Sequence, residues 1–343
     1  MNISIFSSNN DIGHFFIQQG IKKLINGIYN GIDINFQIID KHGVNKIELI
    51  KTILDSTDIL ILGGGPLIWP YFELSDWSKE IYSLLIKYSK SRKTMIALSI
   101  GSCYDVNSSY KYSSPRKEEI YHLLKLIENC KLITTRDEYI NNILVENKIP
   151  SLQLPCIAFN AFYDESKYQD INTKADKMLI NYMYAAGHHD YSFKVNPQQW
   201  NKCIISVLNH FTQKYDVEFI CHSTQELELA KVVDDKIKAN LISNFQDFIE
   251  CNKGVILSMN NRIHASIGQA GLLIPSITVG TDTRIYSLKE FEMPYVKINE
   301  ATSDYLINEM NNQISNREEN VIKLNKKLNQ TIDLYANNIR KII

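Results

Sequence analysis

The stretch from residue 254 to residue 280 constrains the fold more than any other part of this 343-residue chain. It begins with a short apolar run, Val255–Met259, continues through a polar turn into a helical segment that Gly271 ends, and closes with a second apolar run, Ser276–Val279. Short apolar runs bounded by turn residues are typical of strands buried on both faces. The order of strand, turn, helix and strand therefore predicts a parallel crossover unit.

The turn after the first of these strands carries the residues of greatest chemical interest. Asn260 and Asn261 are suited to accept hydrogen bonds from the free N–H groups of a helix that begins near Arg262. Arg262 and His264 are two residues apart, which is the spacing for one side of an extended or turn segment and not for one face of a helix. Ligands bind at the carboxyl ends of parallel strands, and a helix N-terminus favours anions. We therefore predict anion capture here, with proton transfer nearby.

The same two residues have a purely structural interpretation. An isolated Arg-x-His at a helix start is often a solvated arginine followed by a capping or core-edge histidine. The rest of the chain decides between the two interpretations.

Strands and helices alternate through residues 1–165, and the alternation restarts at residue 176 after a polar segment without periodicity. The chain is long enough for two domains with separate cores. We predict an α/β fold with two Rossmann-like domains, 1–165 and 176–302, a cleft that both domains line, and a helical tail over 303–343.

In the first domain, a predicted strand at Ile59–Leu62 runs into Gly63, Gly64 and Gly65. Three glycines let a ligand approach the backbone closely and leave N–H groups for its oxygen atoms. The segment lacks the residues of a P-loop and the G-x-G-x-x-G spacing of a dinucleotide site. Trp69, which follows, suits stacking on a sugar ring, and packing in the core is the alternative.

Two further strand ends in the first domain carry charged residues. Asp11 lies in the loop after the first predicted strand, where a ligand role and a helix-capping role explain it equally well. Arg136 opens the helix after the strand Leu132–Thr135. A cation at a helix start is unfavourable unless an anion faces it, so Arg136 is a candidate ligand contact.

Composition excludes several classes of function. The 37 basic and 38 acidic residues are intermixed, which argues against a nucleic-acid partner. No apolar run approaches the roughly 18 to 20 residues of a spanning helix, and the N-terminus has the pattern of a strand, so we expect a cytoplasmic protein. The densest basic cluster predicts a solvated helix end or, alternatively, a weak docking patch for the inner face of a membrane. This cluster consists of Lys87, Lys90, Arg92 and Lys93.

Neither a metal site nor a disulfide scaffold is expected. The six cysteines are widely spaced without a C-x-x-C pair, and we interpret them as reduced thiols. His188, His189 and His222 have no carboxylate at ligand spacing on a shared element.

Together these features resemble the polysaccharide pyruvyl transferase family, over nearly the whole chain. The most specific likeness is Arg262-Ile-His264-Ala, followed by Gly271, Pro275 and a basic residue, Arg284. The weaker likenesses are Asn10–Gly13, Gly63–Gly65, Ser99–Gly101 and Arg136–Glu138. Two departures stand out. The family commonly has Asn-x-Gly-Asp where this chain has Asp11-Ile-Gly-His14, and lysine where it has Arg284, which keeps the charge.

The resemblance implies a GT-B-type fold and an enzyme that transfers pyruvate from phosphoenolpyruvate to two hydroxyls of a sugar. The ketal would form during bacterial capsule, cell-wall or lipopolysaccharide assembly, on a free or lipid-linked acceptor, with phosphoenolpyruvate as co-substrate and no other cofactor. The implied catalytic residues are His264 and Arg262. The implied donor-binding residues are Arg136, Arg262, Arg284 and Asn261, and the implied acceptor-binding residues are Asp11, Gly63, Gly64, Gly65 and Trp69.

The chemistry of this donor agrees with these residues. Its carboxylate and phosphate need at least two cations, which Arg136, Arg262 and Arg284 can supply. An imidazole with an ordinary pKa near 6.5 suits proton transfer in either direction, and nearby guanidinium groups should lower the pKa of His264. This hypothesis requires the four side chains to converge. Its rivals are a GT-B glycosyltransferase that uses a nucleotide sugar and a non-catalytic relative that binds sugars or anions.

Overall fold

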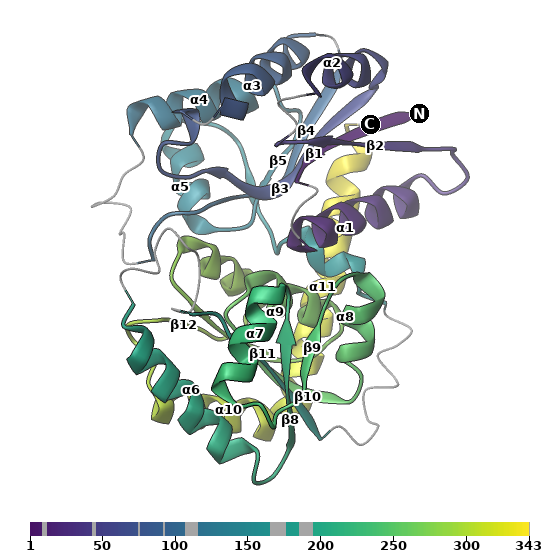
Figure 1. Ribbon diagram of the computed structural model, residues 1–343. Coiled ribbons are helices and arrows are strands. Elements are labelled where there is room, and N and C mark those ends of the chain that lie inside the picture. The colour runs from purple at the N-terminus through teal and green to yellow at the C-terminus, as the bar shows by residue number, and fades with distance from the viewer. Residues whose placement is uncertain are drawn as a thin grey trace. The chain divides into compact units, whose positions relative to one another are not determined.

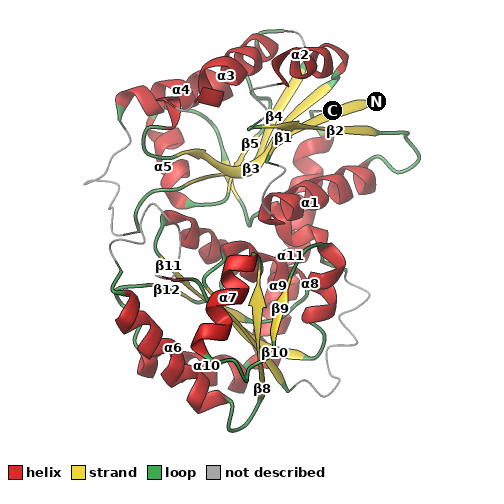
Figure 2. Ribbon diagram, in the orientation of Figure 1, coloured by secondary structure: helices red, strands yellow, loops and turns green. Residues whose placement is uncertain are grey.

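The computed structural model describes residues 1–8, 12–42, 46–74, 76–91, 93–106, 116–164, 176–184 and 195–342, and only the backbone of residues 73 and 76–79. Contacts divide the chain into two compact units. Unit 1 comprises Met1–Tyr104, Ser108–Ala161 and Gln330–Ile343, and unit 2 comprises Asp105–Asn107 and Phe162–Asn329. Each unit is built on one parallel sheet with helices between its strands, which confirms the predicted α/β class and the two Rossmann-like units (Figures 1 and 2).

Unit 1 has the strand order β2-β1-β3-β4-β5-β6. Its elements are β1 (Asn2–Ser7), α1 (Ile12–Ile28), β2 (Asn35–Asp40), α2 (Ile47–Ser56), β3 (Ile59–Ile68), η2 (Phe72–Leu74), α3 (Asp76–Ser89), β4 (Thr94–Ser102), α4 (Lys117–Ile127), β5 (Ile133–Thr135), α5 (Glu138–Glu146), β6 (Leu152–Gln153) and η3 (Ile157–Ala161).

Unit 2 has the strand order β12-β11-β10-β7-β8-β9. Its elements are β7 (Lys177–Asn181), α6 (Pro197–Phe211), β8 (Asp216–Cys221), α7 (Thr224–Val233), β9 (Ala239–Leu241), α8 (Phe245–Cys251), β10 (Val255–Asn260), α9 (Ile263–Gly271), β11 (Ser276–Gly280), η7 (Thr283–Phe291), β12 (Tyr295–Lys297), α10 (Ser303–Ser315) and the first part of α11 (Arg317–Arg340).

The strand orders place a topological switch point in each sheet. In unit 1 the chain adds β2 on one side of β1 and then β3 on the other side. In unit 2 it adds β8 and β9 on one side of β7 and then β10 on the other side. Loops that leave neighbouring strands at such a point run in opposite directions and open a crevice at the carboxyl edge of the sheet.

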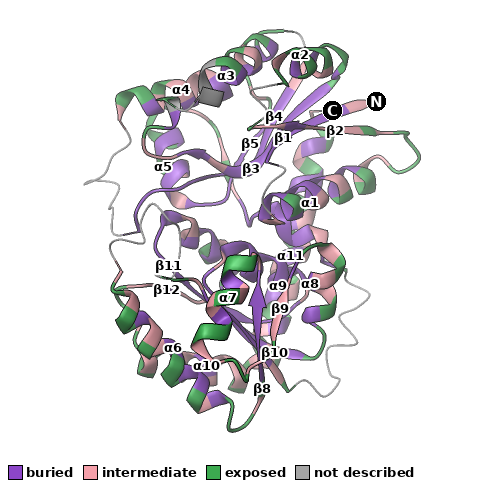
Figure 3. Cartoon of the chain, viewed as in Figure 1, coloured by how far each residue is buried: buried purple, intermediate pink, exposed green. Residues whose placement is uncertain are grey.

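The central strands are buried because their apolar residues are covered by helices on both faces (Figure 3). One core cluster in unit 1 joins Phe6 and Leu60 of the sheet to Ile81 and Ile140 of its helices. A core cluster in unit 2 joins strands β7, β8, β10 and β11 to helices α6 and α10.

Strand β3 is longer than the sequence predicts. The predicted strand ended at Leu62, whereas the observed one pairs with β4 through the glycines and on to Ile68. Gly64 and Gly65 have φ values of 63° and 80°, so the backbone passes through left-handed conformations and still continues the sheet. The sequence predicts the end of the strand at Leu62 because the conformational freedom of glycine also serves turns.

The C-terminal helical segment is also divided. The sequence predicts one long helical tail over 303–343, but the helix breaks at Asn316 into α10 and α11. The residues up to Asn329 belong to unit 2, and those from Gln330 onward belong to unit 1. There Tyr335 is fully buried, with its hydroxyl 3.0 Å from the carbonyl oxygen of Pro155 and 2.8 Å from Oγ of Ser99.

The structure gives two further facts that bear on location and chemistry. Among the described residues, no helix has both the length and the hydropathy needed to cross a bilayer. All six cysteines are free, and burial raises the pKa of Cys221 to about 12, which leaves its thiol a poor nucleophile. In the basic cluster, the Lys93 ammonium donates to the carbonyl oxygens of Leu54 and Asp55 at 3.1 and 2.6 Å, while Arg92 lies outside the described residues.

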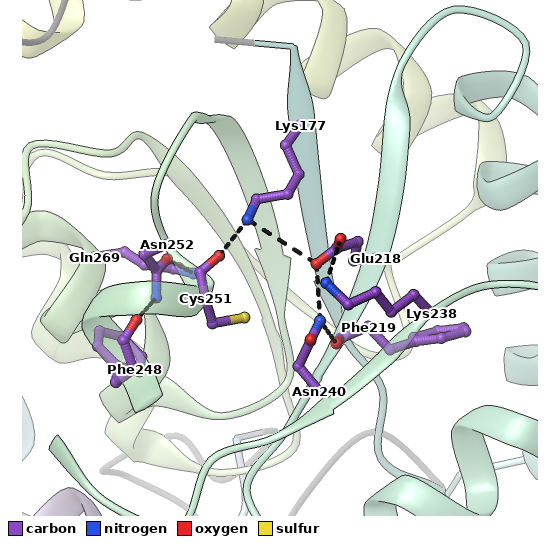
Figure 4. A network of polar contacts seen from close by, with 9 residues as sticks. All are labelled: Lys177, Glu218, Phe219, Lys238, Asn240, Phe248, Cys251, Asn252 and Gln269. Carbon is purple, nitrogen blue, oxygen red and sulfur yellow. Dashed lines mark hydrogen bonds and ion pairs between the residues drawn. The ribbon is translucent and has the colours of Figure 1, made fainter. Parts of the chain in front are cut away.

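A buried carboxylate on strand β8 of unit 2 interacts with two lysines and an asparagine (Figure 4). Glu218 of β8 accepts hydrogen bonds from Lys238 at 2.9 Å and Asn240 at 2.8 Å, and the Lys177 ammonium lies 3.9 Å away. Lys177 also donates to the carbonyl oxygen of Cys251 at 2.6 Å, which ties the start of β7 to the end of α8. Burial opposes ionisation, but these bonds and the two lysine charges together lower the pKa of Glu218 below its ordinary value of 4.5.

Replacing Glu218 by glutamine should therefore change how stability depends on pH. A carboxyl with a lowered pKa stabilises the fold above pH 4.5 and loses that contribution as the pH falls through the folded-state pKa. We expect Glu218→Gln to cost about 1 kcal/mol at neutral pH. The difference from the unmodified protein should shrink below pH 4.5, as measured by urea unfolding across a pH series.

The exposed carboxyl of Asp216, at the start of the same strand, provides the control. Asp216→Asn should leave the stability close to that of the unmodified protein at every pH. A stability difference for Glu218→Gln that grew as the pH fell would contradict this account.

Candidate functional site

The residues singled out in the second half of the sequence lie at the switch point of unit 2. Asn181 ends β7 and Asn260 ends β10, and the two are paired in register and fully buried. Oδ1 of Asn181 accepts the Arg262 backbone N–H at 2.8 Å. Its Nδ2 donates to the Ile220 carbonyl oxygen at 2.9 Å and to Glu226 at 2.8 Å. One asparagine therefore fixes the start of the turn that carries Arg262.

Arg262 is the residue immediately before α9, and its side chain is 35% exposed. Its Nε and Nη2 lie 2.8 and 2.6 Å from Oε1 of Glu226. The pair holds the guanidinium in one orientation and leaves Nη1 outside the ion pair. Helix α9 begins at Ile263, within one residue of the predicted start, so Arg262 lies at the strand-to-helix turn and His264 is the second residue of the helix.

Glu226 is the partner that the sequence interpretation missed. It is buried on α7, where Oε2 also accepts the backbone N–H of His222 at 2.9 Å. The visible signal was Ser223-x-x-Glu226, the spacing of a local capping box, and the Ser223 hydroxyl does accept the Glu226 N–H at 3.2 Å. The glutamate side chain, however, reaches an arginine 36 positions along the chain.

His264 lies in the first turn of α9 and is 9% exposed. Its position depends on a buried polar network on the other side of the helix. Asn260 Nδ2 donates to Ser266 at 2.9 Å and to Gln269 at 2.7 Å, and the Ser266 and Thr278 hydroxyls are 2.6 Å apart. The network fixes the rotation of α9 and hence the direction of the imidazole.

The network continues to α8 (Figure 4). Gln269 donates to Asn252 at 3.0 Å, and Asn252 donates to the Phe248 carbonyl oxygen at 2.8 Å. Buried amides that satisfy one another in this way specify one arrangement of the helices they join.

Arg284 follows the neighbouring strand β11 and forms an ion pair with the carboxylate of Asp282. Its Nε and Nη2 donate to the two oxygens of Asp282 at 2.7 and 2.8 Å, a bidentate pair in which Asp282 is 4% exposed. Asp282 also accepts the Arg284 backbone N–H at 3.0 Å, so it fixes both the main chain and the side chain of the arginine. The sequence interpretation did not include this aspartate.

Asn261, a predicted donor contact, links three strand ends. Its Oδ1 accepts the Met183 N–H at 2.9 Å and its Nδ2 donates to the Val279 carbonyl oxygen at 3.0 Å. Its carboxamide therefore holds together the edge on which Arg262 stands, and direct contact with a donor stays a prediction.

Arg262 and Arg284 are thus each paired with a buried carboxylate. The positive charge of the edge is lower than two isolated guanidinium groups would give. In return, charge-assisted hydrogen bonds fix the direction of each planar group before any ligand binds. Such an edge suits a small anion that is held in one orientation.

Arg136 lies in unit 1, after β5, and is fully buried. Its Nη1 lies 3.8 Å from Sγ of Cys156, and a Cβ at Gly101 would come within 2.5 Å of its Nε. Burial raises the pKa of the adjacent Asp137, although the Arg136 charge and hydrogen bonds from Ile140 and Ser102 act in the opposite direction. The predicted convergence of Arg136 with the three residues of unit 2 stays a prediction.

The predicted acceptor residues of unit 1 divide into two groups. Gly63, Gly64 and Gly65 lie in β3 against α1, and Trp69 follows that strand, partly buried, with its ring centroid 5.4 Å from that of Phe72. Asp11 lies outside the described residues.

A model of the polysaccharide pyruvyl transferase family matches residues 7–283 of the chain. The match covers both strand ends that carry Arg136 and Arg262 and ends one residue before Arg284. No curated protein gives a significant match.

Solved structures of sugar-nucleotide enzymes share the fold. UDP-GlcNAc 2-epimerase from Neisseria meningitidis, bound to UDP-GlcNAc, superposes with a TM-score of 0.59 and 10% identity over 99% of this chain and 100% of that one. A putative UDP-N-acetylglucosamine 2-epimerase from Listeria monocytogenes has a TM-score of 0.57 and 11% identity, over 95% of this chain and 90% of that one. The UDP-GlcNAc 2-epimerase from Methanocaldococcus jannaschii has a TM-score of 0.52 and 15% identity, over 97% of this chain and 93% of that one. At these identities the likeness establishes the GT-B-type fold alone.

Glu226→Gln should disturb the site more than its small change in size suggests. The Glu226 carboxylate now accepts hydrogen bonds from Arg262, Asn181 and the His222 N–H. In the glutamine variant, an NH2 group that can only donate would replace one of the two accepting oxygens. We expect a loss of about 1–3 kcal/mol in unfolding free energy, because the buried groups lose their acceptor. Urea unfolding at neutral pH measures this loss.

The matched control is Glu228→Gln, which removes the same charge from an exposed position on the same helix. That variant should stay within about 0.5 kcal/mol of the unmodified protein. Equal stability of the two variants would show that Glu226 does not anchor the arginine.

Proposed function

Because the chain belongs to the polysaccharide pyruvyl transferase family, we propose that it transfers pyruvate from phosphoenolpyruvate to two hydroxyls of a sugar. The products are a pyruvate ketal and inorganic phosphate, and the reaction serves bacterial cell-surface polysaccharide assembly. Phosphoenolpyruvate is the co-substrate, and the chemistry needs no further cofactor.

The observation that carries the proposal is the set of groups at the carboxyl edge of the unit 2 sheet. Arg262 immediately precedes α9, His264 lies in the first turn of that helix, and Arg284 follows the adjacent strand β11. Two oriented guanidinium groups and one imidazole on neighbouring strand ends match a donor that carries a carboxylate, a phosphate and a carbon that accepts a proton.

The reaction assigns a task to each of these groups. His264 gives a proton to the methylene carbon of the donor, and the first sugar hydroxyl forms a bond from its oxygen to the central carbon. The proton of this first hydroxyl passes to His264 and replaces the one that it gave up. The oxygen of the second hydroxyl then displaces phosphate from the same carbon, and its proton leaves with the phosphate. Arg262 and Arg284 hold the carboxylate and stabilise the charge of the departing phosphate.

The proposal assigns the acceptor to unit 1. Trp69 offers a ring face for a sugar, and the glycine-containing end of β3 allows close approach of the ligand to the backbone. Arg136 remains the third proposed donor contact, and Asp11 remains a proposed acceptor contact.

A second candidate follows from the shared fold. The Neisseria enzyme is bound to UDP-GlcNAc, so a nucleotide sugar is the natural alternative donor. A thermal-shift comparison of phosphoenolpyruvate with UDP-GlcNAc separates the two. Stabilisation by UDP-GlcNAc alone would favour a glycosyltransferase, and phosphoenolpyruvate binding without phosphate release from any acceptor would favour a non-catalytic relative.

The His264→Ala variant tests the assignment of the proton donor. Binding of phosphoenolpyruvate, measured by calorimetry, should change by less than about threefold, because the arginines carry the charge interaction. Phosphate release with a panel of aryl and lipid-linked sugars should fall about 100- to 10,000-fold, the usual contribution of a general acid or base.

His210→Ala, a change in the last turn of α6, is the control and should leave both quantities unchanged. Equal losses of binding and turnover in His264→Ala would contradict a role in proton transfer.

A further inference from the structure

Strand β4 contains an extra residue shortly before its end. Ala97 of β4 pairs with Ile133 of β5. The next pair joins Ile100 to Thr135, three positions further along β4 but only two along β5. Such an irregularity is a β-bulge, and bulges are frequent beside functional sites because they redirect the strand that contains them. Ser99 lies within this bulge, is fully buried and has a φ of 55°.

Serine is an unfavourable residue for this backbone conformation. A positive φ brings the Cβ of an L-residue too close to the backbone, a penalty that glycine avoids. Conformations of this kind persist only where the surrounding structure holds them, and they gather at functional sites. The contacts of Ser99 therefore decide whether β4 keeps its bulge.

Tyr335, in the part of α11 that belongs to unit 1, holds the Ser99 side chain. A carbonyl oxygen can only accept, so the Tyr335 hydroxyl donates its single hydrogen to Pro155 at 3.0 Å. The Ser99 hydroxyl must then donate to the Tyr335 oxygen at 2.8 Å, and it accepts the backbone N–H of Ile157 at 2.9 Å. The Ser99 N–H donates to the Thr134 hydroxyl at 2.7 Å. These hydrogen bonds, the Ser99 lock, fix both the side chain and the backbone of the strained residue.

The phenol of Tyr335 keeps its proton at neutral pH. Burial raises the pKa of Tyr335 above its ordinary value of 10, although hydrogen bonds from Ser99 and Thr134 act in the opposite direction. The hydroxyl therefore remains the donor to Pro155, and its oxygen remains the acceptor for Ser99.

The residues after the bulge frame the turn that carries Arg136. Ile100 accepts the Arg136 backbone N–H at 3.0 Å. Gly101 lies so close that a Cβ there would come within 2.5 Å of Nε of Arg136. Ser102 donates to Asp137 through its backbone N–H at 2.8 Å and its hydroxyl at 3.0 Å, and Asp137 caps α5. A change in the path of β4 at the bulge would therefore move the guanidinium.

We propose that Ser99 and Tyr335 are positioning residues for Arg136. Tyr335 holds Ser99 in its left-handed conformation, and the bulge sets the path of the last residues of β4. These residues then fix the guanidinium in the direction that the donor requires. The inference rests on the proposed function for the identity of that donor, phosphoenolpyruvate, but the Ser99 lock consists of unit 1 residues alone.

Two substitutions at position 99 separate the Ser99 lock from ordinary effects on stability. Ser99→Ala and Ser99→Gly both remove the hydroxyl, but only alanine opposes a φ of 55°. In calorimetric titrations, Ser99→Ala should bind phosphoenolpyruvate about 10-fold or more weakly than the unmodified protein, the loss expected when one charge-assisted contact is displaced. Ser99→Gly should bind it within about threefold of the unmodified protein.

Tyr335→Phe leaves the Ser99 hydroxyl without its acceptor and should also weaken phosphoenolpyruvate binding about 10-fold or more. Adding Ser99→Gly to Tyr335→Phe should restore binding, because glycine keeps the bulge without the lock. Tyr305→Phe, which alters a tyrosine that is 42% exposed on α10, is the matched control and should change nothing. Circular dichroism verifies that each variant is folded at the temperature of the titration. If Tyr335→Phe does not fold, the two variants at position 99 decide the question.

Equal phosphoenolpyruvate affinity of Ser99→Ala and Ser99→Gly would overturn the inference, and so would a Tyr335→Phe variant that binds as tightly as the unmodified protein. Unfolding in urea tests the Ser99 lock without any ligand. Glycine within a strand is normally less stable than alanine, but here Ser99→Gly should unfold at a higher urea concentration than Ser99→Ala. The reverse order would refute the lock. The expected order, together with no phosphoenolpyruvate binding by the unmodified protein, would keep the lock and refute the proposed function.

Discussion

The buried carboxylate of Glu226 is the interaction on which the candidate site depends. It stands on α7, after β8, and accepts hydrogen bonds from the side chains of Asn181 at the end of β7 and Arg262 after β10. A carboxylate with so little exposure is stable only when its oxygens are fully used. Three strand ends are therefore joined through one group, and the guanidinium of Arg262 balances its charge.

Further buried hydrogen bonds in unit 2 make the carboxyl edge of its sheet rigid. Asn260 donates to Ser266 and Gln269 of α9, and Asn261 links the ends of β7, β10 and β11. A helix that is tied to the sheet by buried, satisfied amides cannot rotate without breaking several bonds. Groups oriented in this way before binding stabilise developing charge without the cost of reorganising.

The sequence alone predicted the parts of this arrangement that are local. The crossover unit around Arg262 and His264 and the helix start after Thr135 follow from periodicity and turn residues. The partners could not be predicted, because nothing in the spacing relates Glu226 to an arginine 36 positions away, and its S-x-x-E setting already has a local explanation. Three-residue strands such as β9 are too short for periodicity, and Gly63–Gly65 continue β3 because tertiary pairing overrides a loop-like composition.

The two switch points differ in how they hold their charges. In unit 2 the cations are arginines fixed by carboxylates, so the direction of each donor group is set in advance. At the switch point of unit 1, the Lys41 ammonium lies 3.3 Å from Nε2 of His14 and 6.0 Å from the centroid of the Trp69 ring, and neither contact is bidentate. A planar fork that is fixed in this way suits a small anion bound in one orientation, whereas a flexible ammonium tolerates ligands of several shapes. This difference supports the proposed placement of the donor in unit 2 and of the acceptor in unit 1.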